Sequence, residues 1–508
     1  MRHSRRAVLS AGLGLAGAGL LRARPARAAE ITFADDPFTL GIASGYPEPN
    51  AVVLWTRLAP KPLVPGGDMP AAPVAVQWEI GTDEALRRVV RRGTVSATPD
   101  WAHSVHVEVG GLAPARDYWY RFTSGGARSP VGRTRTAPAR GTLPERLTLA
   151  VACCQHYEQG HYAAHRAIAA DAPDAVVFVG DYIYEGAGTS RVRSHDAPEC
   201  FTLEDYRHRY AIYKSDPSLQ AAHAAAPWLL VSDDHEVGND YAGDHWRISP
   251  PDVFLRRRAA AYQAYYEHVP MPRALKPVDG RQALYTSRAF GDLAALFMLD
   301  GRQYRSPQAC APFPLIACDE MNGPERTMLG AAQEEWLRRS LAASTARWNL
   351  LGQQTVFARF DQSGDGPPSY WADSWNGYPA AQERLVNILL ERPVANPVVF
   401  SGDIHAFLVN DVHAQPKDNG SPIVAAELVA SSISSAQRQS PATFDVWKSE
   451  NPNVHLARGD TRGYLRVAVG PEQLHAELVA VDDITRADSP THVLAAFDVE
   501  NGKPGIAA

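Results

Sequence analysis

Four apolar runs of this sequence end in the same kinds of polar side chain, and this repetition constrains the fold more than any other feature. The runs read VACCQ (Val151–Gln155), VFVGDYIYE (Val177–Glu185), VSDDHE (Val231–Glu236) and VVFSGDIH (Val398–His405). Short valine-rich runs that end in turn residues are typical of buried β-strands. Ligands of open α/β sheets bind beyond the carboxyl ends of the strands. The pattern therefore predicts a sheet edge that gathers Asp, His, Tyr and Cys side chains.

The rest of the chain indicates two regions of different architecture. Residues 34–138 contain runs rich in Val, Trp, Tyr and Thr at 51–58, 74–80, 105–109 and 117–123, which predict an all-β sandwich with a structural role. After a linker at 136–144, strand and helix patterns alternate, which indicates an α/β catalytic domain over residues 145–485. Residues 486–508 are a tail that either closes over the site or is plain surface. We expect strands at 147–152, 175–179, 348–356 and 397–401, and helices at 161–170, 254–268, 331–343 and 380–391.

Residues 1–28 have the features of a cleaved export signal. Arg5 and Arg6 precede an apolar run of 15 residues, and an A-x-A pattern ends the segment. The paired arginines favour the twin-arginine translocase, with the general secretory route as the alternative. Because a helix needs roughly 20 apolar residues to cross a bilayer, we expect no stable membrane span. The protein is expected to be periplasmic or secreted.

The charge of the chain bears on its partners. The formal net charge is −6, and beyond the export signal 44 basic residues stand against 56 acidic ones. An acidic surface disfavours general binding to nucleic acids or anionic membranes. We therefore expect a small-molecule substrate and no specific nucleic-acid binding.

Five cysteines occur, at positions 153, 154, 200, 310 and 318. Cys310 and Cys318 flank a proline-containing loop and are candidates for a disulfide, which export would permit. An odd count leaves at least one thiol for another task. Cys154 is the candidate, with the adjacent Cys153 as the alternative.

The donors at the strand ends fall into two chemical classes. The thiol of Cys154, the phenol of Tyr184 and the imidazole of His405 suit a transition metal, and phenolate with thiolate favours ferric iron. The carboxylates of Asp234 and Asp403 suit a hard cation such as Ca²⁺, Mg²⁺ or Mn²⁺. Asp181 is placed to bridge the two classes. Further oxygen donors are Asn239, Asp240, Gln353 and Gln354. An Asp after a strand often only caps a helix, but four such strand ends in one domain favour the metal site.

Two adjacent metals would suit phosphoester hydrolysis, because they clamp phosphate oxygens and lower the pKa of a bound water. His235 is the candidate proton donor to the leaving group. Arg302, in the run LDGRQYR, is a candidate for bidentate phosphate binding, and the alternative is an ion pair with Asp300.

At these residues the chain resembles the PhoD-type alkaline phosphatases, a branch of the calcineurin-like metallophosphoesterases. The resemblance rests on LGIASGYPEPNAVVLWTRL, CQ, GDYIYE, DDHEVGND, LDGRQYR, DSWNGYP and SGDIH, and it covers nearly the whole chain. It implies a two-sheet αββα catalytic domain after a small β-sandwich domain. It also implies a ferric ion held by Cys154, Asp181, Tyr184 and His405, and calcium held by Asp181, Asp234 and Asp403.

Three functions follow as hypotheses. The first is a secreted alkaline phosphatase that hydrolyses phosphomonoesters, and phosphodiesters too, by attack of a metal-bound hydroxide. The second is a phospholipase D-like phosphodiesterase that uses the same site on phospholipids. The third is a non-enzymatic binding protein, and the complete ligand set argues against it.

Overall fold

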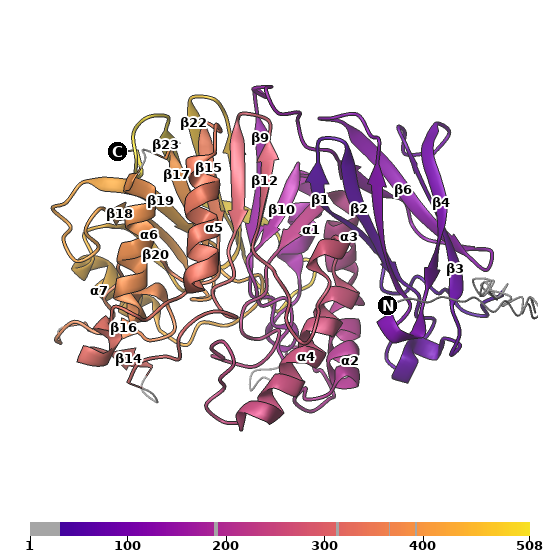
Figure 1. The fold of residues 1–508 in the computed structure, drawn as a ribbon, viewed down its shortest axis with the longest axis horizontal. Coiled ribbons are helices and arrows are strands. Elements are labelled where there is room, and N and C mark those ends of the chain that lie inside the picture. Colours follow the sequence, from indigo (N-terminus) through magenta and orange to yellow (C-terminus); the bar gives the residue numbers. More distant parts are fainter. Residues whose placement is uncertain (1–30, 187–191, 311–313, 365, 392–393, 508) are drawn as a thin grey trace, which may run out of the picture.

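Two large β-sheets form the centre of the structure, and helices cover their outer faces (Figure 1). The computed structural model describes residues 31–186, 192–310, 314–364, 366–391 and 394–507. The expected export signal, residues 1–28, lies outside these ranges. No helix of the described ranges is long and apolar enough to cross a bilayer.

The first sheet has nine strands and contains three of the four motif strands. Its neighbours β9, β10 and β11 run parallel, so their carboxyl ends lie on the same edge of the sheet. In spatial order the strands are β23 (Thr491–Glu500), β22 (Gln473–Val481), β21 (Arg462–Val469), β9 (Leu147–Ala152), β10 (Ala175–Phe178), β11 (Pro227–Leu230), β1 (Ile42–Glu48), β2 (Ala51–Arg57) and β5 (Ser104–Gly110).

The second sheet has seven strands and contains the fourth motif strand. Its strands β13, β15, β17 and β19 run parallel. In spatial order the strands are β12 (Thr286–Phe290), β13 (Ala294–Met298), β15 (Trp348–Gly352), β17 (Pro397–Ser401), β19 (Ile423–Val429), β18 (Phe407–His413) and β20 (Val454–Arg458).

The two sheets pack face to face through one apolar layer. Val151 and Val177 of the first sheet and Leu350 and Phe400 of the second are fully buried in the same cluster. Beside the site, a Cβ on Gly402 would stand 2.6 Å from the sulfur of Cys153. Only glycine fits there, so the turn after β17 is held against the turn after β9.

Helices complete the expected αββα order. Leu337 of α5 and Leu385 of α6 pack on Phe297 and Val399 of the second sheet, and Ile168 of α1 joins the core of the first sheet. The α-helices of the described residues are α1 (Ala163–Asp171), α2 (Leu203–Lys214), α3 (Pro217–Ala225), α4 (Pro251–His268), α5 (Gly330–Ala342), α6 (Pro379–Glu391) and α7 (Pro441–Glu450). The expected fold class is confirmed, with strand bounds at 147–152 and 397–401 as predicted.

The N-terminal strands divide between two sheets. A five-stranded sheet comprises β4 (Val89–Ala97), β3 (Val74–Gly81), β6 (Asp117–Ser124), β7 (Ala127–Arg128) and β8 (Gly132–Arg135). It packs through Val76, Ile80 and Tyr120 on Leu54 and Val107 of β2 and β5. Because β1 also pairs in parallel with β11, one layer of this β region continues the nine-stranded sheet.

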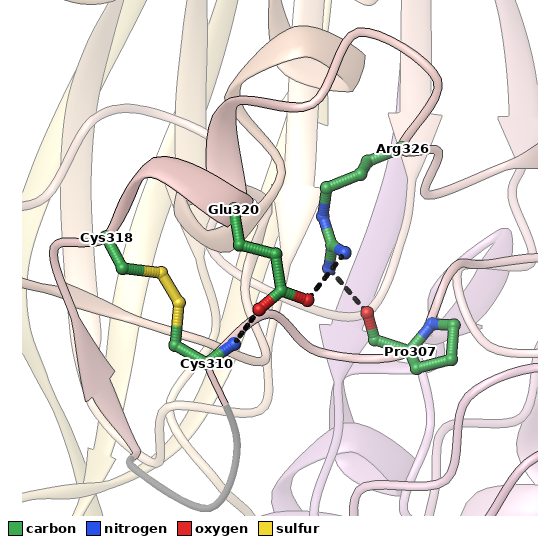
Figure 2. Close-up of a disulfide and its surroundings, with 5 residues drawn as sticks. All are labelled: Pro307, Cys310, Cys318, Glu320 and Arg326. Atoms are coloured by element: carbon green, nitrogen blue, oxygen red, sulfur yellow. Dashed lines mark hydrogen bonds and ion pairs between the residues drawn. A yellow bond between two sulfur atoms is a disulfide. The ribbon is translucent and has the colours of Figure 1, made fainter.

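An edge strand and a disulfide complete the second half of the chain. Within the expected tail, β23 is the edge strand of the nine-stranded sheet. Cys310 and Cys318 form a disulfide (Figure 2), so the expected pairing is confirmed. The disulfide stands beside a two-stranded sheet of β14 (Leu315–Ile316) and β16 (Tyr370–Trp371).

Candidate metal centre

The turns after the parallel strands bring the sequence-predicted site residues together at one edge of the two sheets. Cys154 follows β9, Asp181 and Tyr184 follow β10, and Asp403 follows β17. A cavity of about 940 Å³ opens above them. Its wall includes Asp181, Tyr184, Asp234, His235, Asp403 and His405.

Four of these residues share an uncommon backbone conformation. Cys154, Asp181, Asp403 and His405 have φ values of 55°, 58°, 66° and 56°. A left-handed conformation costs a non-glycine residue roughly 1–2 kcal/mol, and such residues cluster at functional sites. Asp181, Asp403 and His405 line the cavity, and a donor atom of Cys154 lies within 4.8 Å of those of Asp181 and His405.

The soft donors form one group. Single donor atoms of Cys154, Asp181 and His405 all lie within 4.8 Å of one another. Nδ1 of His405 lies 3.0 Å from the carbonyl oxygen of Ala436, so Nδ1 carries the proton and Nε2 is free to act as a ligand. Burial lowers the pKa of His405 to about 3, which keeps the imidazole neutral.

Tyr184 completes this group. Its hydroxyl donates to Asp181 over 2.7 Å and lies 3.0 Å from Nε2 of His405. Ser435 donates a further hydrogen bond of 2.7 Å to the same oxygen. Burial, followed by the charges of Asp181 and Cys154, raises the pKa of the phenol. A cation at this position would have the opposite effect and favour the phenolate.

The hard donors form a second, adjoining group. Carboxylate oxygens of Asp233, Asp234 and Asp403 lie within 4.8 Å of one another, and so do donor atoms of Asp181, Asp234 and His235. Asp181 therefore lies both with the soft donors Cys154 and His405 and with Asp234 of the hard donors. Asp233 had not been singled out in the sequence, because the run VSDDHE does not show which of its two Asp side chains faces the site.

Burial of so many carboxylates is unfavourable without a positive partner. Burial and neighbouring carboxylates raise the pKa of Asp181 and of Asp403. Oδ1 of Asp234 is buried, and no described residue gives it a hydrogen bond. Its positive neighbour is Arg302, whose Nη2 stands 3.3 Å away in an ion pair. With no hydrogen bond and two further carboxylates beside it, this oxygen has the chemistry of a hard-cation ligand. The residues present thus fit a metal centre, with a soft side and a hard side.

Arg302 lies behind the carboxylates instead of in the cavity. Its guanidinium is fully buried and pairs with Asp233 and Asp373, and Nη2 stands 3.3 Å from Asp234 and 3.6 Å from Asp403. The alternative partner, Asp300, accepts from the backbone N–H of Arg302 over 3.0 Å and does not pair with its guanidinium. The structure therefore places Arg302 as a counter-ion to the acidic group.

His235 stands at the cavity wall with a carboxylate behind it. Its Nδ1 lies 2.6 Å from Glu185, and the backbone N–H of Asn239 donates to the other oxygen of that carboxylate over 2.7 Å. Burial disfavours a charged His235, but Glu185, Asp181 and Asp234 outweigh burial and raise its pKa. Glu185 was missed in the sequence, although it closes the run GDYIYE, because spacing alone does not show that it faces a residue 50 positions away.

Glu236 ties two of the turns together. Its carboxylate accepts from the backbone N–H groups of Tyr182, Asp233 and Asp181, over 2.6, 2.8 and 3.2 Å. A Cβ on Gly180 would stand 2.4 Å from the Cβ of Asp233. The missing side chain at Gly180 thus lets the turn after β10 approach the turn after β11.

Of the four further oxygen donors predicted from the sequence, two have other tasks, and Asn239 and Asp240 line the cavity. The side-chain amides of Gln353 and Gln354 are engaged with the scaffold, through Ser401 and Trp375 for the first and Ser232, Leu299 and Gly301 for the second. Asp240 does lie at the site, in a group with Asp234 and Asp373. Asp373 belongs to the run DSWNGYP, whose role the spacing did not reveal.

Comparison with known proteins identifies the family of the chain. The family model described as PhoD-like phosphatase matches residues 149–478, and the model described as PhoD-like phosphatase, N-terminal domain matches residues 24–138. The chain is 43% identical to alkaline phosphatase D of Bacillus subtilis (strain 168) over 98% of its length and 86% of that protein. A solved structure titled "Structure of PhoD" superposes with a TM-score of 0.91 at 42% identity, over 94% of this chain and 93% of the other. The chain therefore belongs to the PhoD-like phosphatase family.

Proposed function

We propose that the protein is an exported, metal-dependent phosphatase that hydrolyses phosphomonoesters, and phosphodiesters as well, at the cavity above Asp181. The observation that carries this proposal is the convergence of soft and hard donors, from four separate strand ends, on one buried floor. The family membership supports the reaction class. The export signal expected at residues 1–28 supports the location.

Each group of donors would hold a different metal. Ferric iron would be held by Cys154, Asp181, Tyr184 and His405, and calcium by Asp181, Asp234 and Asp403. When bound, two adjacent cations neutralise charge on the phosphate oxygens and supply a water of lowered pKa as the nucleophile. The buried walls around Asp181 keep bulk water from weakening these interactions.

The chain's own contribution to proton transfer comes from His235. It stands on the cavity wall, and Glu185 holds its Nδ1 over 2.6 Å, so that Nε2 faces the substrate. A protonated imidazole in this position donates its proton to the oxygen of the departing alcohol. Glu185 fixes the ring plane and stabilises the cationic form, and it is therefore a positioning residue.

The Glu185→Gln variant should discriminate between leaving groups. Phenyl phosphate needs a proton donor for its departing oxygen, whereas p-nitrophenyl phosphate releases a stable anion. We expect kcat to fall about 30-fold for phenyl phosphate and only about threefold for p-nitrophenyl phosphate, because general acid catalysis contributes 10²–10⁴-fold. The measurement is kcat for both esters in both proteins.

Glu199→Gln is the matched control for this comparison. Glu199 also lines the cavity, but its carboxylate pairs with Arg257 over 2.9 Å. Its replacement should leave the ratio of the two kcat values as in the wild type. Equal losses on both esters in Glu185→Gln would show that Glu185 only supports the fold.

Tyr184→Phe tests the identity of the soft-side metal. A phenolate bound to ferric iron gives a visible charge-transfer band, so the purified wild-type protein should show this band and the variant should lack it. Elemental analysis should find iron and calcium in the wild-type protein. Zinc as the sole metal would contradict the assignment of the ligands.

A comparison of substrates tests the proposed function itself. Rates are measured with a phosphomonoester, a phosphodiester and phosphatidylcholine vesicles, each with Ca²⁺ present. Hydrolysis of the two small esters is expected. Turnover of phosphatidylcholine alone would instead favour the phospholipase D-like alternative, and the absence of hydrolysis in all three would refute a phosphoesterase.

A further inference from the structure

The cavity is much larger than its polar floor requires. A volume of about 940 Å³ is typical of pockets that enclose a drug-sized molecule. Beyond the carboxylates and histidines, its wall is formed by large apolar side chains: Trp246, Ile248, Leu315, Phe360, Trp371 and Trp447. The polar floor is sufficient to bind a phosphate, so the apolar wall must contact another part of the substrate.

Two of these apolar side chains, Leu315 and Trp371, form a cross-strand pair. Leu315 of β14 and Trp371 of β16 are direct cross-strand partners in an antiparallel register. Directly opposed side chains of a strand pair contact one another and form one surface. Both line the cavity, and each is 38% exposed. Ile248, which is 65% exposed, belongs to the same cavity wall.

The pair rests on a small core of its own. Ile316 and Tyr370, which alternate with the pair along the same two strands, are buried with Ala309, Met321 and Ala372. The backbone N–H of Ala372 donates to the carbonyl of Pro314 over 2.8 Å. One face of the strand pair is thus anchored, and the other face is left to the cavity.

A disulfide fastens this element, since two-residue strands are too short to be stable alone. The Cys310–Cys318 bond closes the loop that carries Leu315 (Figure 2). Beside it, Glu320 accepts from the backbone N–H of Cys310 over 3.0 Å and pairs with Arg326, which in turn donates to the carbonyl of Pro307. The disulfide sulfurs also pack against the small core.

We propose that Leu315 and Trp371 form a leaving-group subsite that selects phosphoesters whose alcohol carries an apolar group close to the ester oxygen. The phosphate would bind to the metals held at the floor by Asp181 and Asp403, and His235 on the wall protonates the departing oxygen. In this arrangement the alcohol occupies the part of the cavity that Leu315 and Trp371 line. This inference rests on the proposed function and specifies its substrate class.

Three alkyl esters of similar intrinsic reactivity test the subsite: ethyl, hexyl and 2-phenylethyl phosphate. The wild-type protein should hydrolyse the hexyl and phenylethyl esters with kcat/KM about tenfold or more above that of the ethyl ester, because an apolar pocket discriminates by 10–200-fold per missing group. Combined Leu315→Ser and Trp371→Ser replacement should bring these ratios close to one. Preference for both large esters indicates apolar burial, and preference for the phenylethyl ester alone indicates stacking on Trp371; either result supports the subsite.

Val278→Ser is the matched control. Val278 is 68% exposed and is not part of the cavity wall, so its replacement should leave the ratios as in the wild type. Hydrolysis of all three esters at equal kcat/KM would overturn the subsite and leave the proposed function standing. Failure to hydrolyse any of them would overturn the proposed function and the subsite with it.

The disulfide provides a second, independent measurement. Reduction of the wild-type protein with a phosphine should lower the hexyl-to-ethyl ratio, as should the combined Cys310→Ser and Cys318→Ser replacement. The serine variant should not respond further to the reductant. An unchanged ratio after reduction would show that the Leu315–Trp371 pair keeps its place without the disulfide, and a response of the serine variant would assign the effect to another thiol.

Discussion

Replacement of Asp181 by asparagine is expected to lower kcat for p-nitrophenyl phosphate by about 10³-fold, or about 4 kcal/mol of transition-state stabilisation. Asp181 belongs both to the group with Cys154 and His405 and to the group with Asp234 and His235. An amide keeps the shape of the side chain but removes the charge that the two proposed metals would share. The contents of the proposed iron and calcium should fall together, which elemental analysis of the purified variant measures beside kcat.

Asp174→Asn is the control for this prediction. Asp174 lies directly before β10, at the opposite end of the strand that delivers Asp181, and accepts from the backbone N–H of Thr148 over 2.8 Å. Its replacement removes the same charge from the same strand without touching the site. Near-normal kcat and metal content are expected there. Full activity of Asp181→Asn would rule out a bridging carboxylate.

Replacement of Arg302 by leucine is expected to destabilise the protein by about 3–5 kcal/mol, the usual cost of removing one partner from a buried ion pair. The side chain is fully buried and contacts four carboxylates. Without it, those buried carboxylates repel one another with no positive side chain between them. Denaturant midpoints, with and without a chelator, measure the loss, and the loss should be larger in the chelated protein.

Arg338→Leu is the control variant for this loss of stability. Arg338 forms an exposed pair with Glu335 on α5 at 2.8 Å, with both side chains 44% exposed. Surface pairs of this kind contribute about 0–1 kcal/mol. If Arg302→Leu kept its stability but raised KM for phosphate esters, the sequence-based interpretation of Arg302 as a phosphate clamp would be the correct one.

Local sequence patterns were sufficient for the elements that surround the site. Residues 147–152 and 397–401 are strands as predicted, and the four expected helices occur with small shifts at their ends. These segments have an uninterrupted apolar run or a clear helical period. Helix α2 was not predicted because it buries Tyr206, Arg209, Tyr210 and Tyr213, a set that does not resemble an apolar stripe. Its capping box of Thr202 and Asp205 was the available signal.

The sequence patterns did not predict which distant strands pair with each other. Alternation shows which face of a strand is apolar but not which strand lies beside it. The parallel pairing of β1 with β11 joins residues about 180 positions apart, and nothing in the run around Ile42 indicates that partner. The same limit applies to Glu185 and His235, whose contact depends on how two turns approach each other.

The left-handed turns at Cys154, Asp181, Asp403 and His405 have a consequence for laboratory evolution. Each holds an L-residue where glycine would be conformationally easier. Glycine at any of these positions would relieve local strain and remove buried charge or a buried thiol at the same time, so the fold could become more stable as the site disappears. A screen that rewards only heat resistance would tend to erase the ligands one by one. Thermostable variants of this enzyme should therefore be selected with a turnover assay at every round.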